Sequence, residues 1–226
     1  FVELGLASCF SFLRGASDAV DLVMTARALG YDAIGIADAN SFAGIVRVYT
    51  EAAPLKMHPV IGARIETVEG LTFLAYPKDR AAYGRLCQLI SAGRMNTLEG
   101  DWQEKGVCGV HLILLPPEDL EAQFTVPDWA NNVVALDGGE TRGPVTGPVI
   151  GDVTGSVTGS LAQALPHLAS GLPTLKHLAA SYLYRGNDIA RIDRRDALAR
   201  ANGLTLLATN DVHYHAPQRR PMHDVM

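Results

Sequence analysis

The chain has 226 residues, of which 48% are hydrophobic and 19% are charged. This composition is typical of a globular protein with a substantial core and excludes a disordered chain. The formal net charge of −5 argues against a broad surface that grips nucleic acid by its phosphates.

The chain carries no sequence signal for secretion or for a membrane. Three cysteines without a C-x-x-C pair are typical of a reducing compartment. No apolar run reaches the roughly 18 residues of a membrane span, and the start lacks the pattern of a signal peptide. We therefore expect a cytoplasmic protein with no membrane partner.

Helical and extended patterns alternate along the first half of the chain. Helical spacing predicts a helix over residues 18–30, with Ser17 or Asp18 as its cap and Gly30 after its last turn. Further helices are predicted over residues 41–53 and 79–93. Strands are predicted over 31–38 and, as a pair with a turn near Glu69 and Gly70, over 58–77.

The alternation continues in the second half. We predict strands over 110–115, 131–136 and 204–211, a short helix over 117–124, and a helix over 187–203 capped by Asn187. Residues 144–161 repeat V-T-G three times and predict a flexible surface loop. The whole chain, residues 1–226, is then one α/β domain of mostly parallel strands with outer helices, a barrel in preference to an open doubly wound sheet.

One stretch near the end, "LLATNDVHYH", has the spacing of a partial metal site. If it ends a strand, Asp211, His213 and His215 point to one side, because side chains alternate with a period of two. Asp38 ends another predicted strand, and the carboxyl ends of barrel strands form the active face. Imidazole and carboxylate suit zinc, manganese or iron; the alternative is a polar strand end with no ligand.

Four segments spread over nearly the whole chain then point to one family: "FSFLRGAS", "ALGYDAIGIAD" with "NSFAGIVR", "GLTFLAYPKDRAAYGRLCQLIS" and "LATNDVHYHAPQRRPMHDV". In this order they resemble the amino-terminal PHP domain of bacterial C-family DNA polymerases, especially the error-prone branch. The resemblance implies a distorted seven-stranded (β/α) barrel, excised from a longer polymerase whose catalytic region is its partner in the same parent chain. Through that parent it implies DNA-directed synthesis across damage in replication and repair, with Mg²⁺, DNA and other translesion proteins.

Active PHP domains hold a metal cluster at the barrel mouth, and the resemblance implies that most ligand positions are changed here. The changed positions are Gly5, Ala7, Arg14, Ala39 and Arg64. The remaining candidate ligands are Asp38, Asp211 and His213, with Glu66 and His215 as further donors. Because an arginine keeps its charge at any useful pH, we expect Arg14 or Arg64 to pair with Asp38 or Asp211 in place of a metal.

Three functions follow from this pattern. The first is a catalytically silent domain without a cofactor of its own, which supports the polymerase or binds a partner. The second is a residual metal-dependent phosphoesterase or 3'-5' exonuclease that holds one zinc or manganese ion. The third is an anion site in which Arg14 and Arg64 bind a phosphate of DNA or of a nucleotide.

Overall fold

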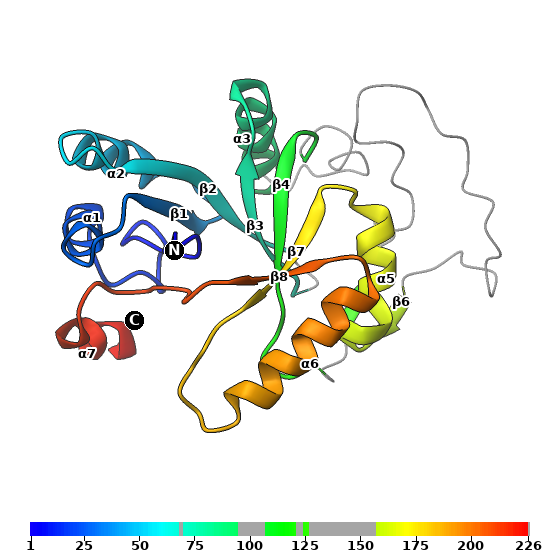
Figure 1. Ribbon diagram of the computed structural model, residues 1–226. Helices are drawn as coiled ribbons and strands as arrows, with labels where there is room; N and C mark the ends of the chain where they lie inside the picture. The colour runs from blue at the N-terminus through cyan, green and yellow to red at the C-terminus, as the bar shows by residue number, and fades with distance from the viewer. Residues whose placement is uncertain (68–69, 95–106, 121–123, 127–156, 226) are drawn as a thin grey trace.

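The structure is a computed structural model that describes residues 1–67, 70–94, 107–120, 124–126 and 157–225 (Figure 1). Its centre is a curled sheet of six strands in the order β1-β2-β3-β4-β7-β8. These strands are β1 (Ala33–Ala39), β2 (His58–Glu66), β3 (Thr72–Pro77), β4 (Val110–Leu115), β7 (Leu175–Ala180) and β8 (Thr205–Ala208).

The directions of the strands correct part of the predicted barrel. The pairs β1–β2, β4–β7 and β7–β8 are parallel, whereas β3 is antiparallel to both of its neighbours. The link from Glu66 to Thr72 passes through Gly70, with φ +87°, and is too short for the crossover that a parallel pair needs. The mixed α/β class is confirmed, while the described residues give this sheet six strands rather than seven and reverse one of them.

The amino-terminal segment lies between the first strand of the sheet and the chain that follows the last. Gly35 N donates to Glu3 O at 2.7 Å and Ala37 N to Leu6 O at 2.9 Å, while Ala7 N donates to Val212 O at 2.9 Å. Apart from one bridge between Leu6 and Ile36, this segment forms no regular ladder. It nevertheless brings the two edges of the curled sheet together around one region.

The helices lie outside the sheet (Figure 1). They are α1 (Ala19–Ala28), α2 (Ile45–Ala52), α3 (Arg80–Arg94), α5 (Leu161–Gly171), α6 (Asp188–Ala201) and α7 (Arg220–Val225), with a short 3₁₀ helix, η2 (Pro217–Arg219). The predicted cap of α1 is confirmed for Asp18, whose carboxylate accepts from Ala19 N. Asn187 holds the capping position of α6 but makes no capping bond through its side chain.

Two groups of buried side chains pack the helices against the sheet, and a third group lies on the strands alone, consisting of Ala37, Leu74, Tyr76, Ile113 and Ala179. The larger packs α3 and α5 against β3, β4 and β7, and the smaller packs α1 and α2 against β1. Phe42 contacts both groups, and its ring lies 4.7 Å from the ring of Tyr83 in α3. The two groups are therefore joined through the turn that precedes α2.

Some predicted elements lie outside the described residues. These are the strand over 131–136, residues 121–123 of the short helix, and residues 144–156 of the predicted loop. The described residues of the short helix contradict the prediction, because residues 117–120 are not helical and Phe124 begins a strand. The remainder of that loop, residues 157–161, forms β6 (Val157–Gly159) and the start of α5; β6 pairs antiparallel with β5 (Phe124–Val126). A capping box between Ser160 and Gln163 begins α5, because it satisfies free N–H groups of the first turn.

Candidate functional site

Asp211 is the centre of a polar cluster where the amino-terminal segment meets the chain after β8. The prediction that a strand carries Asp211, His213 and His215 is wrong, because β8 ends at Ala208 and Asp211 has φ +50°. The two-residue alternation of a strand therefore does not apply. His215 instead contacts Ser17 beside α1, with Nδ1 to Oγ at 2.8 Å.

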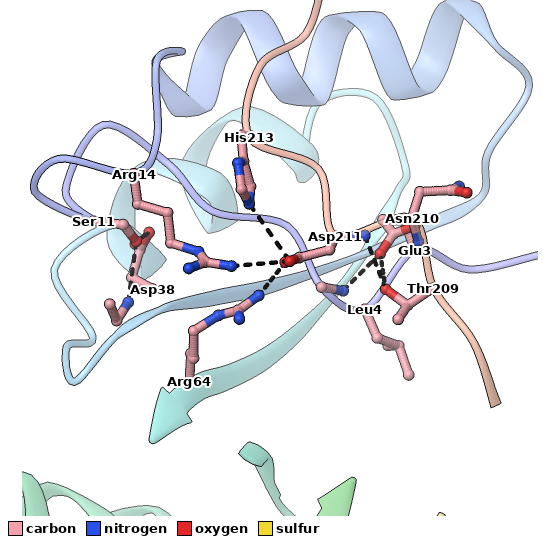
Figure 2. A network of polar contacts seen from close by, with 12 residues as sticks. Glu3, Leu4, Ser11, Arg14, Asp38, Arg64, Thr209, Asn210, Asp211 and His213 are labelled. Atoms are coloured by element: carbon pink, nitrogen blue, oxygen red, sulfur yellow. Dashed lines mark hydrogen bonds and ion pairs between the residues drawn. The ribbon is translucent and has the colours of Figure 1, made fainter. Parts of the chain in front are cut away.

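Two arginines converge on the Asp211 carboxylate (Figure 2). Arg14 Nη2 lies 2.9 Å from Oδ2, and Arg64 Nη2 in β2 bonds Oδ1. Arg14 also reaches Glu66, with Nη1 to Oε1 at 3.7 Å, and His213 Nε2 lies 3.5 Å from Oδ2 of Asp211. The expected ion pair is confirmed for Asp211, whereas no ion pair is found for Asp38 among the described residues.

Because these side chains are largely buried, their charges strongly affect one another's pKa. The Arg64 side chain is only 3% exposed, and burial, together with the charge of Arg14, lowers its pKa despite the nearby Asp211. Burial favours a higher pKa for Asp211, but the His213 imidazole and the two guanidinium groups outweigh it, so the pKa of Asp211 lies below its usual value. The carboxylate is therefore charged at neutral pH and is balanced by two cations.

Asp38 lies at the end of β1 and is bound by uncharged donors. Its Oδ1 accepts from Ser8 N at 2.8 Å and from Ser11 Oγ at 2.6 Å, and its Oδ2 accepts from Ser8 Oγ at 2.8 Å. Asp38 is 1% exposed. Both oxygens are thus used to hold the loop that follows the amino-terminal segment, although the sequence predicts a metal ligand or an arginine partner.

Glu3 is a further buried carboxylate, and sequence reasoning missed it. It is 2% exposed and accepts from Gly5 N at 2.7 Å, from Asn210 N at 2.8 Å and from the Thr209 hydroxyl. Figure 2 shows it beside Asp211. The only signal in the sequence is an acidic residue inside an apolar start, and its role is to join that start to the chain after β8.

Three of the changed positions, Gly5, Ala7 and Ala39, have no side-chain donor group and are closely surrounded by neighbouring residues. A Cβ added at Gly5 would lie 2.6 Å from Thr209 Oγ1 and 3.2 Å from Glu3 Oε1, so a side chain there needs Thr209 or Glu3 to move. Ala7 is fully buried. Ala39 contributes its backbone N, which donates to Ser11 Oγ at 3.0 Å.

His213 is the one predicted ligand, besides Glu66, that shares the cluster with Asp211. Its Nδ1 lies 3.0 Å from His223 Nε2 of α7, so its other ring nitrogen, Nε2, faces Asp211. Within the described residues, no group of three His, Cys, Asp or Glu side chains is placed to hold a metal ion. The side chains around Asp211 do not fit a metal cluster, because two of them are the guanidinium groups of Arg14 and Arg64, which are cationic and offer no ligand atom.

The same geometry limits an anion site. Nε of both Arg14 and Arg64 is buried and has no hydrogen-bond partner, yet each arginine already directs an Nη group at Asp211. A phosphate would have to compete with that carboxylate and with Glu66.

Comparison with known proteins identifies the fold. Residues 3–126, more than half of the chain, match the family described as PHP domain. The chain belongs to the PHP domain family. The PHP domain is 38% identical over 236 residues to the error-prone DNA polymerase of Caulobacter vibrioides and 39% identical over 233 residues to that of Bradyrhizobium diazoefficiens. Each alignment covers 100% of this chain and 18% of the relative.

A solved structure supports the fold of this PHP domain. An amidohydrolase from Chromobacterium violaceum, solved with bound sulfate and no metal, superposes with a TM-score of 0.55 at 10% identity, covering 94% of this chain and 87% of the other. The family match and the two polymerase relatives confirm the resemblance of the sequence to PHP domains of error-prone polymerases. No helix in the described part of the PHP domain is long and apolar enough to cross a membrane.

Proposed function

We propose that this chain is a catalytically silent PHP domain of a longer error-prone DNA polymerase, in which it supports the rest of the chain or binds a partner. The observation that carries this proposal is the pairing of Asp211 with both Arg14 and Arg64. A carboxylate neutralised by two fixed cations is a poor metal ligand. Both guanidinium groups would repel an incoming metal ion, and the ion would have to displace them from the carboxylate.

The size of the relatives supports a role within a larger protein. The chain spans under a fifth of the length of the error-prone polymerases that it matches. In the proposed parent, DNA synthesis across damage during replication and repair belongs to the other regions, with Mg²⁺ as their metal and with DNA and translesion proteins as partners. A cytoplasmic location follows from the same proposal.

Metal binding is the experiment that tests catalytic silence. The purified chain is analysed for metals and titrated calorimetrically with Zn²⁺ and with Mn²⁺, beside an Asp211→Asn variant. A matched control, His58→Asn at the exposed start of β2, reports on surface binding by a histidine. We expect no stoichiometric binding by wild type; one equivalent that is lost in Asp211→Asn and kept in His58→Asn would overturn the proposal.

The alternative is a residual phosphoesterase or exonuclease that holds a single zinc or manganese ion through Asp211 and His213. One observation favours it: His213 Nε2 is buried without a hydrogen-bond partner and lies 3.5 Å from Asp211 Oδ2. Its test is Mn²⁺-dependent hydrolysis of bis-p-nitrophenyl phosphate and of single-stranded DNA from the 3' end. This alternative requires activity that disappears in both Asp211→Asn and His213→Ala.

A further inference from the structure

Residues 8–15 form a closed loop that the buried Asp38 holds from inside. Beyond the bonds from Ser8 and Ser11 to Asp38, Arg14 N and Gly15 N both donate to Ser11 O at 3.0 Å, and Ser11 N donates to Ser8 O at 2.9 Å. Figure 2 shows Ser11 and Arg14 on this loop, with the Arg14 side chain directed at Asp211. The loop is therefore fixed both to Asp38 and to Asp211.

The closure of this loop leaves no room for a side chain at its end. A Cβ at Gly15 would lie 1.8 Å from the backbone oxygen of Ser8, which is far inside contact distance. The backbone thus folds tightly on itself between Ser8 and Gly15. Such a loop has one strongly favoured conformation, so whatever it presents to solvent is presented rigidly.

What the loop presents is an apolar tip, consisting of Phe10, Phe12 and Leu13. Phe12 is 85% exposed, Leu13 59% and Phe10 39%. Leu13 also has φ +58°, a left-handed conformation that costs a leucine on the order of 1 kcal/mol. A strained backbone that holds three large apolar side chains partly or largely in water contributes nothing to the core, and such outliers concentrate at sites of function.

The charges around the apolar tip indicate the chemistry of its partner. Arg47 of α2 lies over the ring of Phe10, with its guanidinium carbon 5.7 Å from the ring centre. This guanidinium is paired with Asp18 at 2.7 Å, and Arg14 is paired with Asp211. These neighbouring cations are neutralised, so the tip offers apolar surface rather than a phosphate site, which agrees with the net charge of −5.

We propose that the apolar tip docks into an apolar pocket on the remaining part of the same polymerase chain. This rests on the proposed function only in that the domain is part of a longer polymerase. The occupant is inferred from length, because the matching relatives have more than four fifths of their chain outside this domain. A contact within one chain gains a high effective concentration, so a small anchor of three side chains is sufficient.

Thiol labelling compares the exposure of the apolar tip in the 226-residue chain with its exposure in the full polymerase chain. Phe12→Cys is introduced into a Cys9→Ser background, both in this 226-residue chain and in the full polymerase chain, and maleimide labelling at position 12 is followed by peptide mass spectrometry. We expect labelling to be about tenfold or more slower in the full polymerase, because the contact must open first. The matched control is Ile189→Cys on α6, 70% exposed, which should label at equal rates in both.

A second pair of variants tests whether docking matters to the assembly. Phe12→Ser combined with Leu13→Gly should leave the unfolding midpoint of the 226-residue chain unchanged or raised, yet should increase cleavage between the domain and the rest of the polymerase by trypsin. Ile189→Ser should do neither. Equal labelling of position 12 in both settings, or unchanged cleavage, would overturn the docking proposal, whereas metal binding lost in Asp211→Asn would overturn catalytic silence alone.

Discussion

The Asp211 carboxylate binds two arginines, so we expect its substitution to cause a large loss of unfolding free energy. Asp211→Asn leaves Arg64, only 3% exposed, without its counter-charge. Removing one partner of a buried pair costs roughly 3 kcal/mol in unfolding free energy, and we expect about this loss at pH 7. Urea unfolding followed by circular dichroism measures it.

The pH dependence of that loss has a definite sign. Because the pKa of Asp211 is lower in the folded chain than the usual value near 3.9, its contribution is complete above about pH 4 and is lost as the pH falls through the folded pKa. The difference in unfolding free energy between wild type and Asp211→Asn should therefore become smaller at acid pH. Glu66→Gln, which removes only a contact at 3.7 Å, is the control and should change little; a gap independent of pH would contradict the assignment.

Gly15 and Gly84 form a matched pair of glycines with opposite surroundings. Gly15→Ala places a methyl group 1.8 Å from Ser8 O, and we expect a loss of about 1–3 kcal/mol, as for other overpacked sites. Gly84 lies in α3 with nothing within 4 Å of an added Cβ, so Gly84→Ala should stabilise the helix by up to about 1 kcal/mol. Denaturant midpoints of the two variants should move in opposite directions.

At the scale of elements, Asp188 organises the link between β7 and α6. Its carboxylate accepts from Leu183 N at 2.8 Å and from Arg185 N at 2.7 Å, and it pairs with Arg191 at 2.7 Å. Burial opposes its charge, but these donors outweigh it and its pKa lies below the usual value. We expect Asp188→Asn to accelerate amide exchange at Leu183 and Arg185, while the exposed Asp193→Asn of α6 leaves both unchanged.

The elements that sequence reasoning found were those with local signals. The cap at Asp18 and the turn at Gly70 each follow from a few neighbouring residues, and α1 and the β2–β3 hairpin formed as predicted. Neither α5 nor β7 was predicted. The helix α5 follows a low-complexity segment and contains Pro166, so its sequence gives a weak helical signal. The sequence did not show that β3 is also antiparallel to β4, because that pairing joins strands that lie far apart in the chain.

Some contacts of the candidate site were also predicted from the sequence, and others were not. The pairing of Asp211 with Arg14 and Arg64 followed from the family resemblance and from simple charge. By contrast, Ser8 and Ser11 around Asp38 were not predicted, because hydroxyl groups close in sequence carry no motif for a carboxylate thirty residues away. Glu3 was missed for the same reason: its partners Thr209 and Asn210 lie at the opposite end of the chain.

At the scale of the whole molecule, the join between the two groups of buried side chains decides whether the chain unfolds as one unit. Phe42 contacts both groups, and its ring lies against Tyr83. The amino-terminal segment also bonds both β1 and the chain after β8. A substitution that destabilises one group should therefore also destabilise the other.

Leu165 of the larger group and Leu22 of the smaller one are both buried, and they test this coupling. Each change to alanine should cost about 3 kcal/mol and lower the midpoint of thermal unfolding by roughly 6–12 °C. We expect one calorimetric transition in each variant, with amides of β1 and β4 losing protection together. If Leu165→Ala exposed β4 while β1 kept its protection, the two groups would be separate folding units and the single-domain prediction would fail.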